Sequence, residues 1–203
     1  MKQNIRKQTF KTLYEVADDQ EGFFTAQQAI DAGFGEKNHA YHVKSGNWIR
    51  EQRGIYRLAN YPRSDRWDLI LYYFWSRDRN DDPQGIYSHE TAMSFYELSD
   101  LNPSKLHMTV PKGFRRTEVP KIIVLHYGLI PKTDLRKSGV LKFTTPFRTI
   151  LDLITSNQSD EKFIQQGIKE GLHRGLLTKE ELKDPRISGT VSEKLKSLLK
   201  GVI

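Results

Sequence analysis

The stretch from Gly22 to Leu58 constrains the fold most, because it holds the start and stop signals of two short helices followed by a hairpin. Thr25 and Gln28 have the spacing of a capping box, in which the two side chains satisfy free N–H groups at the start of a helix. Gly33 stands where a helix commonly ends on a left-handed residue. The pattern therefore predicts a helix from about Ala26 to a turn at Gly33.

A second short helix is expected over residues 37–45, with Gly46 ending it. Ala40 and Val43 have the spacing of a face that packs on the core. The remaining face carries side chains that can reach base edges or phosphates in DNA. These polar candidates are Lys37, Asn38, His39, Tyr41, His42 and Ser45.

The segment Trp48–Leu58 predicts a hairpin, because its residues alternate in polarity and Gly54 can form a tight turn. Between Lys37 and Arg66 there are seven basic and two acidic residues, a local charge of +5 in a chain whose total is +7. Neutralising phosphates releases counterions, so such a cluster favours salt-dependent binding to nucleic acid. The expected phosphate contacts are Lys44, Arg50, Arg53 and Arg57.

Residues 5–58 are therefore interpreted as a winged helix-turn-helix module of three helices and a wing. This class of fold commonly places its second short helix in a major groove. The alternative is a protein docking module whose basic hairpin is only solvated surface, since a fold does not determine a function.

The length of 203 residues fits two domains. Pro62 and its polar neighbours mark an exposed connection, which predicts a winged helix-turn-helix domain over 1–62 and a larger domain over 63–203. The second domain is expected to be α+β, with a small sheet packed on helices. Its expected helices cover 67–75, 88–98, 145–154, 159–174 and 192–199, and its expected strands cover 106–110, 122–127 and 140–144.

Composition excludes several chemistries. The chain has no cysteine, so it has no disulfide, no thiolate nucleophile and no zinc–thiolate site. No apolar run is long enough to span a bilayer, and the polar first residues lack the features of a signal peptide, so a cytoplasmic protein is expected. Without a phosphate-binding or dinucleotide-binding glycine motif, no cofactor is expected.

None of the candidate catalytic residues has the partners that catalysis needs, so we expect a protein that is not an enzyme. In 88–90, Ser-His-Glu are consecutive and point in different directions, so we expect Ser88 to be a helix cap rather than a nucleophile. His39 and His42 lie one turn apart but have too few neighbouring ligands for a metal. Glu181 and Lys183 resemble part of a nuclease motif, yet no strand supplies a paired aspartate.

Two further charged groups have open interpretations. Lys112, Arg115 and Arg116 form a basic turn that either extends a DNA footprint or makes a separate surface for RNA or an acidic partner. Arg148 and Asp152 are four residues apart on an expected helix, and they form either a surface ion pair that contributes a few tenths of a kcal/mol or a functional contact with a partner.

Five segments together resemble the AbiEi family of bacterial antitoxins. They are Gly22–Gly33, Trp48–Leu58, Tyr87–Ala92, His107–Pro111 and Thr144–Asp152, and the resemblance covers most of residues 5–155. The combination of the winged helix with the Thr-Pro-x-Arg-Thr-Ile-x-Asp segment is more specific than the winged helix alone.

The resemblance implies a role in a type IV toxin-antitoxin (abortive infection) system for phage defence. Such proteins are transcriptional repressors of their own operons, binding inverted repeats of double-stranded DNA, where two copies assemble. They also antagonise a nucleotidyltransferase-like toxin without forming a stable complex, and this task requires the C-terminal domain. The alternative is that the protein lacks the antitoxin activity and is a stand-alone winged-helix regulator or a protein-interaction module.

Overall fold

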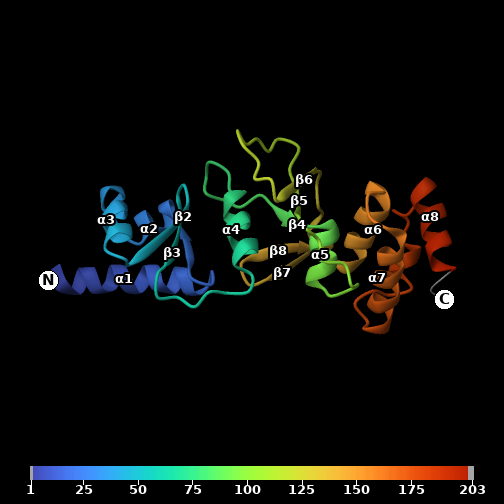
Figure 1. Cartoon of the computed structure of the whole chain (residues 1–203), viewed down its shortest axis with the longest axis horizontal. Helices are drawn as coiled ribbons and strands as arrows, with labels where there is room; N and C mark the ends of the chain where they lie inside the picture. The colour runs from blue at the N-terminus through green and yellow to red at the C-terminus, as the bar shows by residue number, and fades with distance from the viewer. Residues whose placement is uncertain (1, 201–203) are drawn as a thin grey trace. The chain divides into compact units, whose positions relative to one another are not determined.

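A computed structural model describes residues 2–200, with side chains from residue 8 onward, and Figure 1 shows its elements. The described residues divide into two compact units, of which the first ends at Gln84 and includes residues 139–141. This unit extends past the boundary expected at residue 62, because helix α4 (Trp67–Trp75) packs on its sheet. Trp67 lies against Phe23, with ring centroids 6.3 Å apart, and Arg66 pairs with Glu21.

The first unit consists of three helices, a small sheet and α4 (Figure 1). Its further elements are α1 (Lys2–Asp18), β1 (Phe23–Thr25), α2 (Ala26–Asp31), the 3-10 turn η1 (Glu36–Asn38), α3 (His39–Lys44), β2 (Trp48–Gln52) and β3 (Ile55–Leu58). The strands form an antiparallel sheet in the order β1-β3-β2. Strand β1 was not expected, because its three residues are too few to show a strand period.

Local signals in the sequence account for the start of α2. The Thr25 hydroxyl accepts from the Gln28 backbone N–H at 3.1 Å, and the Thr25 N–H donates to Gln28 Oε1 at 2.9 Å. The expected capping box is therefore confirmed. Phe24 is fully buried against Trp48, with ring centroids 4.9 Å apart, and anchors the core beneath the helices.

The second unit has a mixed sheet in the order β6-β5-β4-β8-β7, followed by a helical layer (Figure 1). Its strands are β4 (Ile86–Tyr87), β5 (Leu106–Val110), β6 (Ile123–Tyr127), β7 (Leu135–Ser138) and β8 (Leu141–Thr144). Its helices are α5 (His89–Phe95), α6 (Pro146–Ser156), α7 (Glu161–His173) and α8 (Gly189–Leu199), with 3-10 turns η2 (Lys132–Asp134) and η3 (Glu181–Lys183). The α+β class expected from the sequence is confirmed.

Apolar faces of α5, α6, α7 and α8 form one buried cluster that includes Met93, Ile150, Leu153 and Ile168. Thr145 caps α6 by accepting from the Arg148 N–H at 3.3 Å, and Pro146 occupies the first helical position as expected. The cap of α7 is Asp160, one residue after the serine at which the helix was expected to start. Among the described residues, no helix is long and apolar enough to cross a membrane.

Candidate nucleic-acid interface

The second short helix is rotated relative to the face expected from its apolar residues. His39 and His42 are buried, with 4% and 6% of their surface exposed, whereas Ala40 is exposed. The expectation that both histidines lie on the outward face is therefore wrong, as is the expectation that Ala40 packs on the core. Two imidazoles fill the space beside Trp48 that a methyl group would leave open.

Aromatic packing determines this rotation. The His42 ring stacks on Trp48 at a centroid separation of 4.6 Å and meets Phe34 edge to face at 5.0 Å. His39 contacts the same tryptophan at 5.3 Å and Tyr56 at 5.7 Å. These histidines thus orient the helix from beneath instead of contacting a ligand.

The outward face of η1 and α3 is polar and basic. Tyr41 is 61% exposed, and the expected DNA contacts Lys37, Asn38 and Lys44 are also exposed. Because these positions follow one another at helical spacing, they present one aromatic ring and two ammonium groups on the same side of the element. This arrangement can contact phosphates and base edges together.

The hairpin of β2 and β3 corresponds to the expected wing. Arg50 and Arg53 are exposed on it, and Gly54 has φ +70° in the turn between the strands. Arg57 is different, because its Nε lies 2.9 Å from Glu51 Oε1 and both side chains are only 11% exposed. Its Nη1 also donates to the carbonyls of Leu58 and Tyr61. Arg57 therefore differs from the exposed phosphate contact that was expected, since its charge is paired inside the unit.

The expected basic turn of the second unit lies after β5. Lys112, Arg115 and Arg116 are exposed, and Phe114 between them is buried as an anchor. Arg115 Nη1 donates to the Lys112 carbonyl at 2.9 Å, and the Arg116 guanidinium lies 5.7 Å from the Phe114 ring centre. The two arginine side chains therefore fold back on the turn, while all three charged residues remain exposed.

Basic charge is not confined to the N-terminal unit. Residues 105–142 contain nine basic and two acidic residues, a local charge of +7 that exceeds the +5 of Lys37–Arg66. One of the two acids, Asp134, is buried and paired with Arg148 and Arg186. The excess of basic charge is therefore not concentrated in the winged helix, as was expected, because the second unit carries a larger excess.

The Ser88–His89 pair differs from the sequence expectation. Ser88 precedes α5 but makes no side-chain cap bond to it. Its hydroxyl instead lies 2.8 Å from Thr109 Oγ1 and 2.9 Å from His89 Nδ1, so the neighbouring side chains do meet. His89 adopts φ +51°, a backbone conformation that the sequence did not indicate and that brings its ring to the serine.

His89 belongs to a stack of three imidazoles over the sheet. Its ring lies 3.5 Å from that of His126, centroid to centroid, and His126 Nε2 lies 3.0 Å from His107 Nδ1. Burial, with a smaller effect of the neighbouring imidazoles, lowers the pKa of His89 to about 3 and that of His126 to about 4. Burial also lowers the pKa of His107, although Glu90 opposes that shift.

This histidine stack packs as a neutral aromatic cluster. Ser88 is fully buried, so its hydroxyl is not exposed to solvent. Within residues 8–200, no group of three histidine or carboxylate side chains has the arrangement needed to hold a metal ion.

Arg148 and Asp152 also differ from expectation, because they belong to a partly buried network. Arg148 Nε lies 2.7 Å from Asp152 Oδ1 and its Nη1 lies 3.3 Å from Asp134 Oδ2. Arg186 reaches the same Asp134 oxygen at 2.7 Å. Burial raises the pKa of Asp152 against the opposing effect of Arg148. The pair therefore connects α6 to η2 instead of lying on the helix surface.

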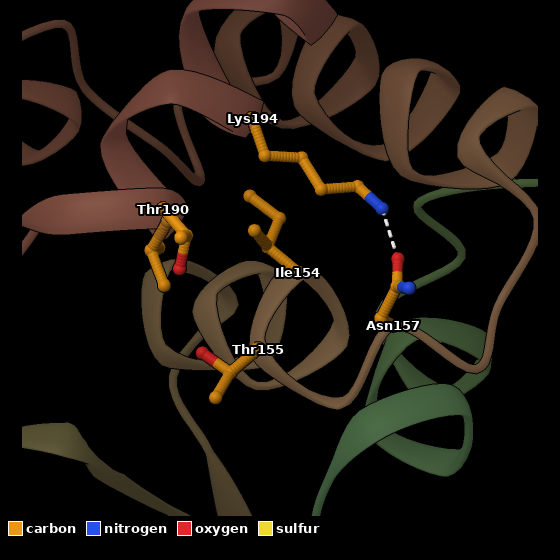
Figure 2. A pocket seen from close by; sticks show the side chains of 6 residues that line it. Ile154, Thr155, Asn157, Thr190 and Lys194 are labelled. Atoms are coloured by element: carbon orange, nitrogen blue, oxygen red, sulfur yellow. Dashed lines mark hydrogen bonds between the residues drawn. The ribbon is translucent and has the colours of Figure 1, made fainter.

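A cavity of about 390 Å³ opens between α6 and α8 in the second unit (Figure 2). It is lined by Ile154, Thr155, Asn157, Thr190, Val191 and Lys194. Figure 2 shows the Lys194 ammonium directed at the Asn157 side chain, to which it donates, and it also lies 3.2 Å from Glu161. The Lys194 ammonium is already paired with the Glu161 carboxylate, so it does not offer a free positive charge to an anionic ligand in the cavity.

The first unit has the element order and the exposed basic surface of a winged helix-turn-helix module. Residues 11–59 match the family described as "Transcriptional regulator, AbiEi antitoxin". This confirms the resemblance to AbiEi antitoxins over residues 11–59 and supports a DNA-binding antitoxin regulator at the level of the family. No curated protein matches the sequence.

A solved structure shares the fold over most of the chain. The crystal structure of the Rv2827c protein from Mycobacterium tuberculosis superposes with a TM-score of 0.59 at 14% sequence identity. The match covers 93% of this chain and 74% of that one. At this identity the likeness shows the fold alone.

Proposed function

We propose that the protein is a transcriptional autorepressor that binds double-stranded operator DNA through the outward face of α3 and the wing. The observation that carries this proposal is the exposed set Lys37, Asn38, Tyr41, Lys44, Arg50 and Arg53 on a module that matches a regulator family. In this proposal Asn38 and Tyr41 read base edges in a major groove. The lysines and the two wing arginines supply phosphate contacts, which fix orientation more than sequence choice.

Binding to inverted repeats would bring two copies of the winged helix to one operator. Each copy uses the same face, so the spacing of the half-sites reflects the distance between two α3 helices on the duplex. The exposed Lys112, Arg115 and Arg116 are a second basic surface that either adds phosphate contacts or serves another partner.

The family match supports an antitoxin role, and our proposal extends this role to a type IV toxin-antitoxin system that acts in phage defence in the cytoplasm. In this proposal the second unit antagonises a nucleotidyltransferase-like toxin without forming a stable complex with it. The first observation is whether a neighbouring reading frame encodes a nucleotidyltransferase-like protein, and the experiment is coexpression of that protein with this chain. Rescue of growth by the whole chain supports the antitoxin role, and loss of viability despite expression of the chain contradicts it.

The DNA-binding proposal is tested by fluorescence anisotropy on a duplex from the chain's own upstream region at two salt concentrations. Removing one phosphate contact should reduce the slope of log K against log salt by about 0.9. Arg50→Ala with Arg53→Ala should therefore weaken binding and lower the slope by about 2. Lys169→Ala, which removes an exposed charge from α7, is the matched control. Wild-type affinity in the double variant would contradict the role of the wing.

A further inference from the structure

The segment that follows α4 contacts the turn of the wing. Arg77 Nη2 donates to the Arg53 carbonyl at 3.1 Å, and its Nη1 donates to the Phe74 carbonyl at 2.8 Å. Its Nε lies 2.9 Å from Asp81 Oδ1. The Arg77 and Asp81 side chains are only 18% and 21% exposed, so this guanidinium is oriented on three sides by the protein itself.

Asp81 extends the same contact to the first helix of the helix-turn-helix. Its Oδ2 accepts from the hydroxyl of Thr25, the residue that caps α2. The first N–H of that helix, on Ala26, donates to the Gly54 carbonyl at 3.0 Å. We call Arg77 and Asp81 the wing clamp, because together they join α4, the start of α2 and the turn of the wing.

The turn residue fits closely against this clamp. Gly54 has φ +70°, and a Cβ built there would lie 2.7 Å from Arg77 Nη2. A side chain at this position would therefore be strained and would also displace the guanidinium. The close approach keeps the Arg53 carbonyl within hydrogen-bonding distance of Arg77.

We propose that Arg77 is a positioning residue for DNA binding, holding the turn of the wing so that Arg53 presents its side chain to the phosphate backbone. This inference rests on the proposed function. The charge of Arg77 is compensated by Asp81, and its donors are directed at protein carbonyls. Its effect on DNA is therefore exerted through Arg53 and not through a phosphate contact of its own.

A double-mutant cycle on DNA affinity separates positioning from direct contact. Arg77→Ala should weaken binding about tenfold, since it removes the hydrogen bond that a charged donor makes to the turn of the wing. In the Arg53→Ala background the same change should cost less than about twofold, because the residue it positions is already absent. Arg79→Ala, which removes an exposed charge two residues along the same segment, is the matched control and should bind as wild type does.

Two further variants keep the test decisive if Arg77→Ala unfolds the unit. Arg77→Lys retains the charge but cannot donate to Phe74, Arg53 and Asp81 at once, so the binding defect should persist. Asp81→Asn retains the size of the side chain and should weaken binding in the same direction. Amide hydrogen exchange at residues 53–55 should become faster in both variants, and this readout requires no DNA.

The outcomes distinguish failure of the positioning role from failure of the proposed function. Additive effects of Arg77→Ala and Arg53→Ala, or full affinity in Arg77→Lys, would overturn the positioning role while leaving DNA binding intact. Unchanged affinity and unchanged exchange in Arg77→Ala would do the same. Absence of binding by the wild-type chain would instead overturn the proposed function, and the inference with it.

Discussion

The imidazole of His42 stacks on the indole of Trp48, with ring centroids 4.6 Å apart and planes inclined by 25°. The contact lies in the core of the first unit, between α3 and the first strand of the wing. It joins the two elements of the proposed DNA-binding surface and determines which face of α3 points outward.

His42→Ala should lower the free energy of unfolding by about 2–4 kcal/mol, because it leaves a cavity beside Trp48 and Phe34. Urea denaturation measures this directly. Tyr41→Ala, one residue earlier and 61% exposed, is the control and should change stability by less than about 0.5 kcal/mol while weakening DNA binding. A destabilising Tyr41→Ala with a neutral His42→Ala would show that the helix has the opposite rotation.

Arg57→Ala should destabilise the first unit by about 1–3 kcal/mol, since it leaves the half-buried Glu51 carboxylate without its guanidinium partner. Arg50→Ala on the same hairpin removes the same charge from an exposed position and should leave stability nearly unchanged. DNA affinity should show the opposite order. At a temperature where both variants are folded, Arg50→Ala should weaken DNA binding more than Arg57→Ala does. Equal effects of the two changes on both properties would contradict the assignment of Arg57 to an internal role.

The three stacked histidines should make the second unit sensitive to acid. The folded-state pKa values of His89 and His126, about 3 and about 4, lie below the unfolded value near 6.5. Below pH 6.5 the unfolded chain therefore binds protons that the folded chain does not, so stability falls as pH decreases from about 6.5 to 4. The contribution of each histidine is at most about 1.4 kcal/mol per pH unit.

The acid effect is measured by chemical denaturation at a series of pH values. His126→Gln should reduce the slope, because one low-pKa imidazole is removed. His173→Gln, at an exposed position at the end of α7, should leave the slope unchanged. Identical slopes in all three proteins would mean that the buried imidazoles do not control acid unfolding.

Gly22→Ala should destabilise the first unit by about 1–3 kcal/mol. Gly22 has φ +90°, and a Cβ there would lie 2.6–2.8 Å from three atoms of the Tyr61 side chain. Its carbonyl also accepts from the Leu58 N–H, which closes the sheet beside β1. Gly113→Ala is the control, since a Cβ at Gly113 meets nothing within 4 Å. Thermal unfolding of the two variants compares these positions, and similar midpoints would contradict the close contact with Tyr61.

Elements with complete local signals were predicted well from the sequence. The capping box at Thr25, the apolar run of α4 and the strand Leu106–Val110 are formed as expected. The strands that were missed, β1, β4 and β7, have only two to four residues, and β1 and β4 also depend on pairing with segments far along the chain. Short strands carry too little periodicity for a sequence pattern to identify them.

The candidate DNA-binding residues illustrate the same division. Lys37, Lys44, Arg50 and Arg53 are exposed as the pattern of charge predicted. His39, His42 and Arg57 were placed on the same surface because their side chains are polar. In the fold, the two imidazoles pack as aromatic rings and the guanidinium pairs with Glu51.

The sequence by itself determined the order of helix, turn, helix and hairpin, the basic charge around them and the resemblance to a regulator family. The order of the elements follows from local chemistry, namely caps, glycine turns and the spacing of apolar residues, whereas the charge and the resemblance are read directly from the residues themselves. Only the tertiary structure decided which face of α3 is exposed, which arginines have internal partners and how Arg77 contacts the wing. Those properties depend on side chains far apart in the chain, since burial and ion pairing are decided by packing and not by residue type.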